Sequence, residues 1–410
     1  MAVTLRLPLC TVPLGVRKVY IYWIIEIQKH ARIYSNVCKF GFLFSIYVIM
    51  GKRMWNLLFL FGFMCLVYNI TIMVKWRGQN YRDKVIVRPE DEQDTRDSRV
   101  LQDQGGPAST PKKPLLVLIL SSLPRSGSTM LAEALSTLPG SVLFFEPLWI
   151  QEKNDCINQE SCVSKFLMDV FDCTYEEAFE TWLRGKRLFF SFFHPEVRKC
   201  LQEPKESVSK CTSQIDVRSL CRDAPVRVMK VIRSKLVFLE DYIRDTDVNL
   251  KVIYLTRDPR GSLNSISKFK SWNQDPHERC HSLEDDLATY ELFSEIYPSR
   301  VLHVKYEDFC LDPEGKASEI ISFLVGNPAI PQELRDYLAK HMSERRGDWN
   351  MGTFKDSKTE FQAWRSKISQ DLLKKVEAEP ACSNSILKMG HRLFRSLGVA
   401  RNFNVSLFSR

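Results

Sequence analysis

The sequence is short of glycine, of histidine and, over most of its length, of net charge. Its 17 Gly in 410 residues exclude a collagen-like repeat, and its 12 Cys are too few for a small disulfide-rich scaffold. Hydrophobic residues make up 44% of the chain, which is too many for a disordered protein. The length therefore indicates one large or two ordinary domains with a substantial core.

The net charge of +9 lies entirely at one end of the chain. Residues 1–77 hold ten Lys/Arg and one Asp/Glu, whereas residues 78–410 hold 48 of each. A surface for nucleic acid or another polyanion needs an excess of positive charge. The sequence therefore predicts no nucleic-acid partner, and only local groups of cations remain to bind anions.

Metal-binding motifs are also missing, because no Cys-x-x-Cys pair occurs and histidines are few, so we expect no metal. Nine cysteines follow residue 77, and six of them lie between Cys156 and Cys221. This usage is typical of disulfides in an oxidising lumen, although the pairing cannot be read. Because nine is an odd number, at least one thiol is either free or paired with a second chain. The sequence therefore leaves open whether the protein forms a homodimer.

One long run without charge stands near the start. Residues 54–74 contain no Asp, Glu, Lys, Arg or His, and as a helix they would span roughly 30 Å, the thickness of a bilayer core. We predict a transmembrane signal-anchor helix there, after a cytoplasmic tail at 1–53 and before a polar luminal stem at 75–113. Because Met50 opens a string that resembles a natural start, we interpret 1–49 either as an upstream extension of the gene model or as a genuine tail.

The orientation of this anchor rests on more than flanking charge. The count of basic residues slightly favours the opposite orientation. The cysteine usage and the sequon at Asn404, a predicted glycosylation site, instead favour a luminal C-terminal domain. We therefore expect a single-pass type II protein, with its main domain at 114–400 and a C-terminal tail at 401–410.

A phosphate-binding loop is predicted near the start of this domain. The run LLVLILSS has the length of a strand, the string LPRSGST follows it, and MLAEALSTL has helical spacing. Loop N–H groups and a helix N-terminus in this order cradle phosphate groups. The loop is not a Walker A motif, because GK[ST] is absent.

Further apolar runs at 142–145, 226–232, 251–256 and 301–305 alternate with helix-length segments. Together with the first run they predict a parallel α/β sheet covered on both faces. Ligands of such sheets bind at the carboxyl ends of the strands. Those ends carry cations and one carboxylate, namely Arg125, Glu146, Arg233 and Arg257.

Three strings in order, LPRSGSTML, FFEPLW and YLTRDPRGSLNSI, closely resemble the membrane-bound carbohydrate sulfotransferases, specifically the galactose/N-acetylgalactosamine/N-acetylglucosamine 6-O-sulfotransferase group. The resemblance runs from about residue 115 to about residue 399. It implies a P-loop-like three-layer α/β sandwich with a central parallel sheet, the sulfotransferase fold. It also implies the donor 3′-phosphoadenosine-5′-phosphosulfate (PAPS), which yields 3′,5′-ADP (PAP), no metal, a Golgi membrane location and a glycan acceptor on a glycoprotein or glycosaminoglycan. The chain departs from the family at His391, where tyrosine is usual.

The resemblance also assigns roles to residues of this chain. The donor-binding set comprises Pro124, Arg125, Ser126, Gly127, Ser128, Thr129 and Met130 for the 5′-phosphosulfate, with Arg257 and Ser265 for the 3′-phosphate. Arg125 would offset charge on the leaving oxygen, and Glu146 would be the general base if partial burial raises its pKa toward neutrality. Second-rank candidates for sulfate, phosphate or acceptor contacts are Lys230, Arg233, Arg260 and Lys355.

Several alternatives stay open from the residues alone. Glu146 could instead orient the sugar or clamp Arg125, and Arg257 could form a structural pair with Asp258. Trp149, Trp272, Trp349 and Trp364 could stack on a sugar or pack in the core. For the whole chain, a luminal P-loop kinase and a catalytically inactive glycan-binding membrane protein are the competing functions.

Overall fold

The computed structural model describes residues 113–152, 155–185, 192–203, 208–213, 215–343 and 356–409. The predicted tail, membrane span and nearly all of the stem therefore lie outside the described residues. Within the described ranges, no helix is long and apolar enough to cross a membrane.

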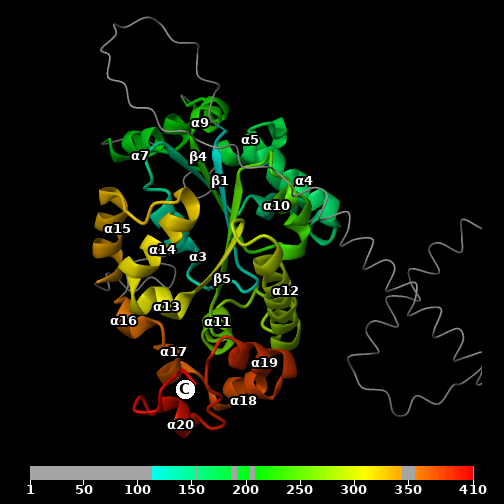
Figure 1. Cartoon of the computed structure of the whole chain (residues 1–410), viewed down its shortest axis with the longest axis vertical. Coiled ribbons are helices and arrows are strands. Elements are labelled where there is room, and N and C mark those ends of the chain that lie inside the picture. Colours follow the sequence, from blue (N-terminus) through cyan, green and yellow to red (C-terminus); the bar gives the residue numbers. More distant parts are fainter. Residues whose placement is uncertain are drawn as a thin grey trace, which may run out of the picture. The chain divides into compact units, whose positions relative to one another are not determined.

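A six-stranded sheet forms the centre, in the order β3-β2-β4-β1-β5-β6 (Figure 1). All five predicted strands are present and parallel, which confirms the predicted sheet. A sixth strand, β3, pairs antiparallel with β2 at one edge and was not predicted. The strand bounds are β1 Leu115–Leu120, β2 Ser141–Phe145, β3 Phe192–Phe193, β4 Val226–Val231, β5 Leu250–Thr256 and β6 Val301–Lys305.

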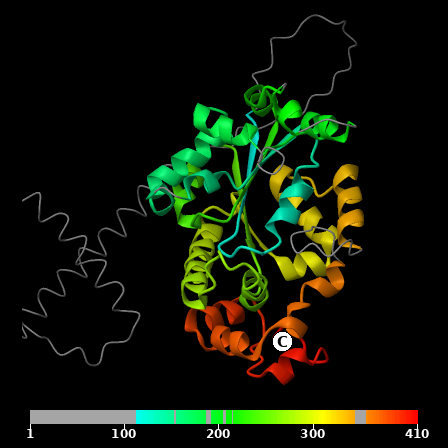
Figure 2. The same cartoon turned by 180° about the vertical axis from the view of Figure 1, so that it is seen from behind.

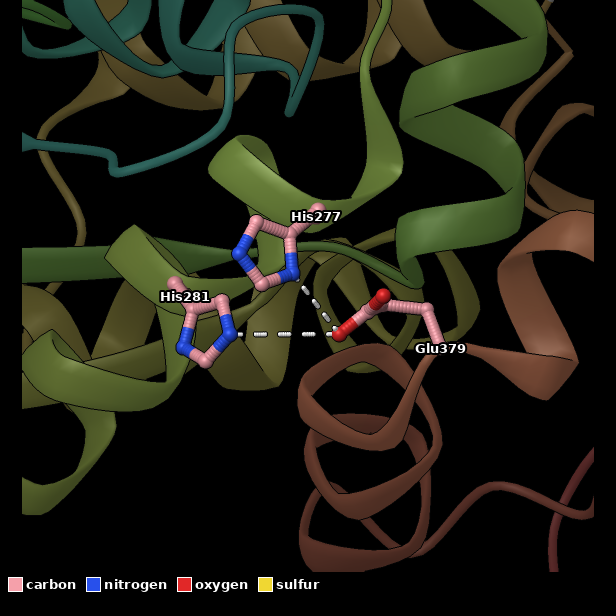
Figure 3. Close-up of side chains that lie close together, drawn as sticks. All are labelled: His277, His281 and Glu379. Atoms are coloured by element: carbon pink, nitrogen blue, oxygen red, sulfur yellow. Dashed lines mark hydrogen bonds and ion pairs between the residues drawn. The ribbon is translucent and has the colours of Figure 1, made fainter.

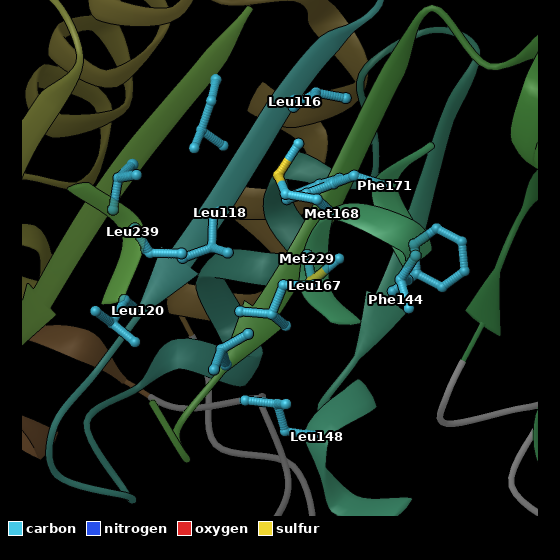
Figure 4. Close-up of a cluster of buried hydrophobic side chains, with 14 of the residues drawn as sticks. Leu116, Leu118, Leu120, Phe144, Leu148, Leu167, Met168, Phe171, Met229 and Leu239 are labelled. Atoms are coloured by element: carbon cyan, nitrogen blue, oxygen red, sulfur yellow. The ribbon is translucent and has the colours of Figure 1, made fainter. Parts of the chain in front are cut away.

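Helices cover both faces of the sheet, as Figures 1 and 2 show from opposite sides. Because both faces are covered, every residue of β1 is buried, which explains its continuous apolar run. Leu116, Leu118 and Leu120 point to one face, where they meet Leu167 and Phe171 (Figure 4). Elements on or beside this face are η1 Pro147–Gln151, η2 Asp155–Asn158, α4 Glu160–Phe171, α5 Glu177–Arg184, α7 Pro195–Gln202, α8 Val208–Ser213, α9 Val217–Asp223, η3 Leu236–Leu239, α10 Glu240–Arg244 and α12 Pro276–Ile296.

The alternate side chains of β1, Val117 and Ile119, point to the opposite face and pack with a second set of helices. That set comprises α3 Ser128–Leu135, α13 Tyr306–Leu311, α14 Pro313–Val325, α15 Gln332–Met342, α16 Ser357–Glu360, α17 Trp364–Lys367, α18 Gln370–Ala378 and α20 Leu397–Arg401. A smaller cluster joins α11 Pro259–Ile266 to α12, α18 and α19 Pro380–Lys388. The result is the predicted three-layer arrangement.

The last residues belong to the fold, which corrects the predicted tail at 401–410. Leu407 is buried, and Phe408 forms a β-bridge with His391. Arg365 is fully buried and donates to the backbone oxygens of Ala400, Asn402 and Val405. The domain therefore extends at least to residue 409.

Four disulfides join eight of the nine cysteines that follow residue 77. They are Cys156–Cys162, Cys173–Cys221, Cys200–Cys211 and Cys280–Cys382. The ninth, Cys310, is a buried free thiol. The expected use of disulfides and the odd thiol are thus both found.

Candidate functional site

A cavity of about 560 Å³ opens at the carboxyl ends of the strands, which is within the usual range of about 300–1,000 Å³ for small-molecule sites. Ten of the predicted site residues line it, contributed by the loop after β1, the start of α3, the ends of β2, β4 and β5, and α11. They are Arg125, Gly127, Ser128, Thr129, Met130, Glu146, Arg257, Ser265 and the second-rank Lys230 and Arg233. Pro124 and Ser126 belong to the loop but do not line the cavity, and Lys355 lies outside the described residues.

The loop after β1 is shaped by residues with positive φ. Arg125 has φ 67° and Gly127 has φ 90°, and Gly127 directly precedes α3. A Cβ on Gly127 would lie 2.5 Å from the ring of Tyr306, so the loop lies on that ring with no room for a side chain. Glycine at this position lets the loop turn into the helix and leaves its N-terminus open toward the cavity.

Two guanidinium groups meet beside this loop. Arg125 donates from Nε to Ser265 Oγ over 3.1 Å, and Arg257 donates from Nη1 to the backbone oxygen of Arg125 over 2.8 Å. Burial lowers the pKa of Arg125, and the charge of Arg257 lowers it further. The guanidinium of Arg257 also stacks on Tyr306, 4.4 Å from the ring centre. An anion placed between the two arginines would relieve their repulsion.

Glu146 lies between two cations in the same cavity. Its carboxylate accepts from Lys230 at the end of β4 and from Arg233, which also contacts Glu152 over 3.3 Å. Burial alone would raise the pKa of Glu146, but Lys230 and Arg233 outweigh it and the pKa is lowered. This corrects the expected rise toward neutrality. Glu146 is therefore a carboxylate at neutral pH, and its partners are Lys230 and Arg233 rather than Arg125.

Arg260 has a different role from the one considered for it. Its side chain is fully buried, and it binds Asp258 over 2.7 Å and Glu377 over 2.6 Å. It does not line the cavity, so it is not a contact for sulfate, phosphate or acceptor. Because Asp258 pairs with Arg260, the alternative of a pair between Arg257 and Asp258 is not found. His391 lies in the same buried cluster, with Nδ1 3.5 Å from Asp258.

Some residues that line the cavity were not among the predicted donor-binding or catalytic residues. Tyr306, which follows β6 directly, supports both the loop and Arg257. Its place at a strand end is the one signal that could have pointed to it. Asn264 and Lys268 line the cavity one and three residues from Ser265. Trp149, Trp272 and Trp364 also line it, whereas Trp349 lies outside the described residues.

Two buried donors beside the cavity have no hydrogen-bond partner. Arg257 Nε and Trp364 Nε1 are buried and have no hydrogen-bond partner in the described part of the chain. Buried donors without partners are uncommon in folded proteins. Both belong to side chains that line the cavity beside Arg125 and Ser265. Both atoms are closed to solvent and lie against Gly261 of α11, so a ligand in the cavity meets other atoms of these side chains.

Curated proteins and solved structures match part of this chain. Human carbohydrate sulfotransferase 3 is 30% identical over 210 residues, which cover 46% of this chain and 43% of that protein. Human carbohydrate sulfotransferase 1 is 28% identical over 213 residues, which cover 46% of this chain and 50% of that protein. The match thus spans at most about half the length of these relatives. The sulfotransferase domain of the Synechococcus PCC 7002 olefin synthase aligns at 17% identity, over 71% of this chain and all of that domain, with a TM-score of 0.37.

The sequence model of the sulfotransferase family matches residues 117–328. This range begins in β1 and includes the loop with Gly127, Glu146, Lys230 and Arg257, all of which line the cavity. The match covers more than half of the chain, and its curated relatives are carbohydrate sulfotransferases. The chain therefore belongs to the sulfotransferase family.

Proposed function

We propose that the protein transfers the sulfuryl group of PAPS to a sugar hydroxyl, the 6-OH of N-acetylglucosamine, galactose or N-acetylgalactosamine in a glycoprotein or glycosaminoglycan. The observation that carries the proposal is a single cavity that is lined both by a pair of arginines and by a carboxylate bound to two cations. The family and its carbohydrate sulfotransferase relatives support the reaction class. The choice of the 6-OH rests on the quoted sequence strings.

The donor would lie along the loop and α11. In this proposal, backbone N–H groups at the start of α3 bind the 5′-phosphate, and Arg257 with Ser265 binds the 3′-phosphate. Arg125 contacts Ser265 and can therefore order both ends of the donor site. When bound, the donor supplies the activated sulfuryl group. Arg125, Ser128 and Thr129 offset the negative charge that grows on the leaving oxygen.

Glu146 would accept the proton of the acceptor hydroxyl. Its lowered pKa keeps it ionised at neutral pH, so it is ready to accept a proton but is a weak base while Lys230 and Arg233 hold it. Both cations also line the cavity. As they turn part of their hydrogen bonding to the sulfuryl oxygens, the carboxylate becomes more basic. Lys230 and Arg233 thus couple binding of the sulfuryl group to activation of the base.

The location we propose is the Golgi membrane, with residues 54–74 as the anchor and the catalytic domain in the lumen. Four disulfides support an oxidising compartment, because such bonds are rare where thiols are kept reduced. Asn404, in the sequon, is exposed and therefore accessible for glycosylation.

Sulfuryl transfer is tested with a radiolabelled donor. We expect the full chain to move ³⁵S from PAPS to one acceptor in a panel of O-linked and N-linked glycans, chondroitin, keratan and heparan. Absence of transfer to every acceptor would refute the proposal. Transfer of the γ-phosphate of ATP would favour a kinase, and glycan binding without transfer would favour an inactive binding protein.

The roles of Glu146 and Arg257 are separated by two variants. Glu146→Gln should lower turnover by roughly 10²–10⁴-fold, because the proton acceptor is lost. It should still be retained on immobilised 3′,5′-ADP, which also shows that it folds. Arg257→Ala should lose that retention as well as activity. Normal turnover in Glu146→Gln would rule out its role as the base, and unchanged retention of Arg257→Ala would rule out its role in binding the donor.

A further inference from the structure

Two histidines and a glutamate meet away from the cavity, where α12 approaches α19. His277 and His281 lie one helical turn apart on α12, and both imidazoles face the carboxylate of Glu379 at the start of α19 (Figure 3). His277 Nδ1 lies 3.3 Å from Glu379 Oε1, and His281 Nε2 lies 3.9 Å from the same oxygen. None of the three residues lines the cavity described above.

We propose that His277, His281 and Glu379 bind a divalent transition-metal ion, Zn²⁺ by preference. Two imidazole nitrogens and a carboxylate oxygen are a common protein ligand set for zinc. Ligand atoms placed tetrahedrally at about 2.0–2.1 Å from zinc lie about 3.3 Å apart. The three potential ligand atoms here are within 4.8 Å of one another, so small side-chain rotations bring them to that spacing.

A second carboxylate supports this assignment. Glu284, three residues after His281, has Oε2 3.8 Å from His281 Nδ1, which is the ring nitrogen that does not face Glu379. Metal-binding histidines usually donate their second ring nitrogen to a carboxylate or carbonyl, which fixes the ring and its tautomer. Glu284 is itself held by Asn384 of α19 over 3.0 Å. At 3.8 Å the Glu284 carboxylate does not yet hydrogen-bond the ring, but a small side-chain rotation brings it to the ring nitrogen that a metal on Nε2 would leave available.

The spacing of these residues is visible in the sequence once the site is known. The string His277-Glu278-Arg279-Cys280-His281 has the H-E-x-x-H pattern, in which two histidines on one helix face bind zinc. In zinc peptidases with this pattern the glutamate acts as the base. Here Glu278 accepts from the side chain of Asn273, which lies before the helix. We therefore infer metal binding without peptide hydrolysis, and the earlier expectation of no metal is revised for this site.

The metal would join two helices that a disulfide already joins. Cys280 lies between the two histidines on α12 and is bonded to Cys382 on α19. The histidines are partly exposed, with 63% of the His277 side chain and 38% of the His281 side chain accessible, so the ion can enter from solvent. Three protein ligands leave a fourth position for water. The site would add a reversible link beside the covalent one.

Zinc titration of the full chain tests this proposal. The chain, prepared without a histidine tag and dialysed against EDTA, is titrated with ZnCl₂ by calorimetry, and bound metal is counted by elemental analysis. We expect one Zn²⁺ per chain and a higher Tm with zinc. The variants His281→Ala and Glu379→Gln should each lower the affinity at least tenfold and remove the rise in Tm.

His194→Asn is the matched control. It removes an imidazole at the start of α7, where asparagine can still accept the hydrogen bond from Glu196 N, so zinc binding should not change. Circular dichroism shows whether each variant is folded, and Co²⁺ in place of zinc reports tetrahedral ligation through its visible spectrum. No stoichiometric binding, or binding that survives both ligand variants, would overturn the proposal.

Discussion

Glu146 holds a backbone conformation that few residues other than glycine adopt. It has φ 50° and ψ 55° and is followed by Pro147, which disfavours helical conformations for the residue before it. Its N–H donates to the backbone oxygen of Lys230 over 2.9 Å, and its side chain binds the same lysine. Strained conformations of this kind cluster at functional sites, where the surroundings enforce them. This backbone conformation places the carboxylate between Lys230 and Arg233.

Gly127 is the residue of the loop for which a side chain should be most harmful. Alanine there has to adopt φ 90° and to displace the ring of Tyr306, which would lie 2.5 Å from the new Cβ. We expect Gly127→Ala to lower the free energy of unfolding by about 2–4 kcal/mol, from backbone strain plus overpacking. It should also weaken retention on immobilised 3′,5′-ADP.

Gly326→Ala is the matched control for that variant. Gly326 also has positive φ, 75°, but nothing lies within 4 Å of its Cβ position. Gly326→Ala should therefore lower the free energy of unfolding by only the backbone strain, about 1–2 kcal/mol, and leave donor binding unchanged. Equal losses in the two variants, measured by urea denaturation, would mean that contact with Tyr306 contributes nothing.

Asp286 makes the free energy of unfolding depend on pH. Burial raises its pKa from 3.8 to about 6, although Ser122 Oγ and Leu236 N donate to the carboxylate. The folded state thus binds the proton more tightly than the unfolded state, so the stability contribution of Asp286 is full below pH 4 and is lost as the pH rises through 6. Ionisation of Asp286 at neutral pH therefore lowers the free energy of unfolding by roughly 2–3 kcal/mol.

We therefore expect Asp286→Asn to be more stable than the wild type at pH 7.5. Asparagine keeps the shape and can still accept from Leu236 N, and the hydroxyl of Ser122 can turn to accept. The gain, about 1–3 kcal/mol, should vanish at pH 4. Urea denaturation at both pH values measures it. A constant difference at both would show that ionisation of Asp286 is not the cause.

Two arginines show which side-chain positions can be predicted from the sequence and which cannot. Arg257 and Arg260 come from one string, RDPRG, yet the first lines the cavity and the second is enclosed by Asp258 and Glu377. Arg257 ends a strand, and the strand edge fixes its place. The place of Arg260 depends on Glu377, more than a hundred residues away, which no local pattern reveals. The same holds for the lowered pKa of Glu146, because the register of β2 and β4 brings Lys230 beside it.

At the scale of elements, long apolar runs were enough to predict the five parallel strands, because burial on both faces makes them continuous. The edge strand β3 has two residues and pairs through Leu143 and Phe144, so its sequence offers no period to detect. The predicted end of the domain, at residue 400, is too early for a similar reason. Residues after 400 are mostly polar, and their packing depends on Arg365.

Removal of residues 402–410 should therefore destabilise the whole domain. Arg365 would lose the backbone oxygens of Asn402 and Val405, and the buried side chain of Leu407 would be lost. We expect a loss of about 3–5 kcal/mol, typical of a buried charge that loses its partners. Asn404→Gln is the control, since it removes the sequon and leaves this packing in place. A truncated chain with the wild-type urea midpoint would restore the idea of a separate tail.

At the scale of the whole molecule, the distribution of charge bears on anion binding, and the disulfides bear on stability. Residues 78–410 carry as many acids as bases, so anion binding depends on where the strand ends place a few cations. Two disulfides, Cys156–Cys162 and Cys200–Cys211, close short loops of the cysteine-rich segment, whereas Cys280–Cys382 joins residues 102 apart. A cross-link that closes a longer loop removes more entropy from the unfolded chain.

The contribution of the long loop can be measured against a short one. In the chain-entropy account, Cys280–Cys382 should stabilise the fold by about 5 kcal/mol and Cys156–Cys162, six residues apart, by about 2 kcal/mol. We expect the double variant Cys280→Ala/Cys382→Ala to lose correspondingly more stability than Cys156→Ala/Cys162→Ala in urea denaturation. EDTA must be present, so that no metal at His277, His281 and Glu379 replaces the lost bond. Equal losses, or a larger loss for the short loop, would contradict the entropic account and indicate that packing around each bond decides its contribution.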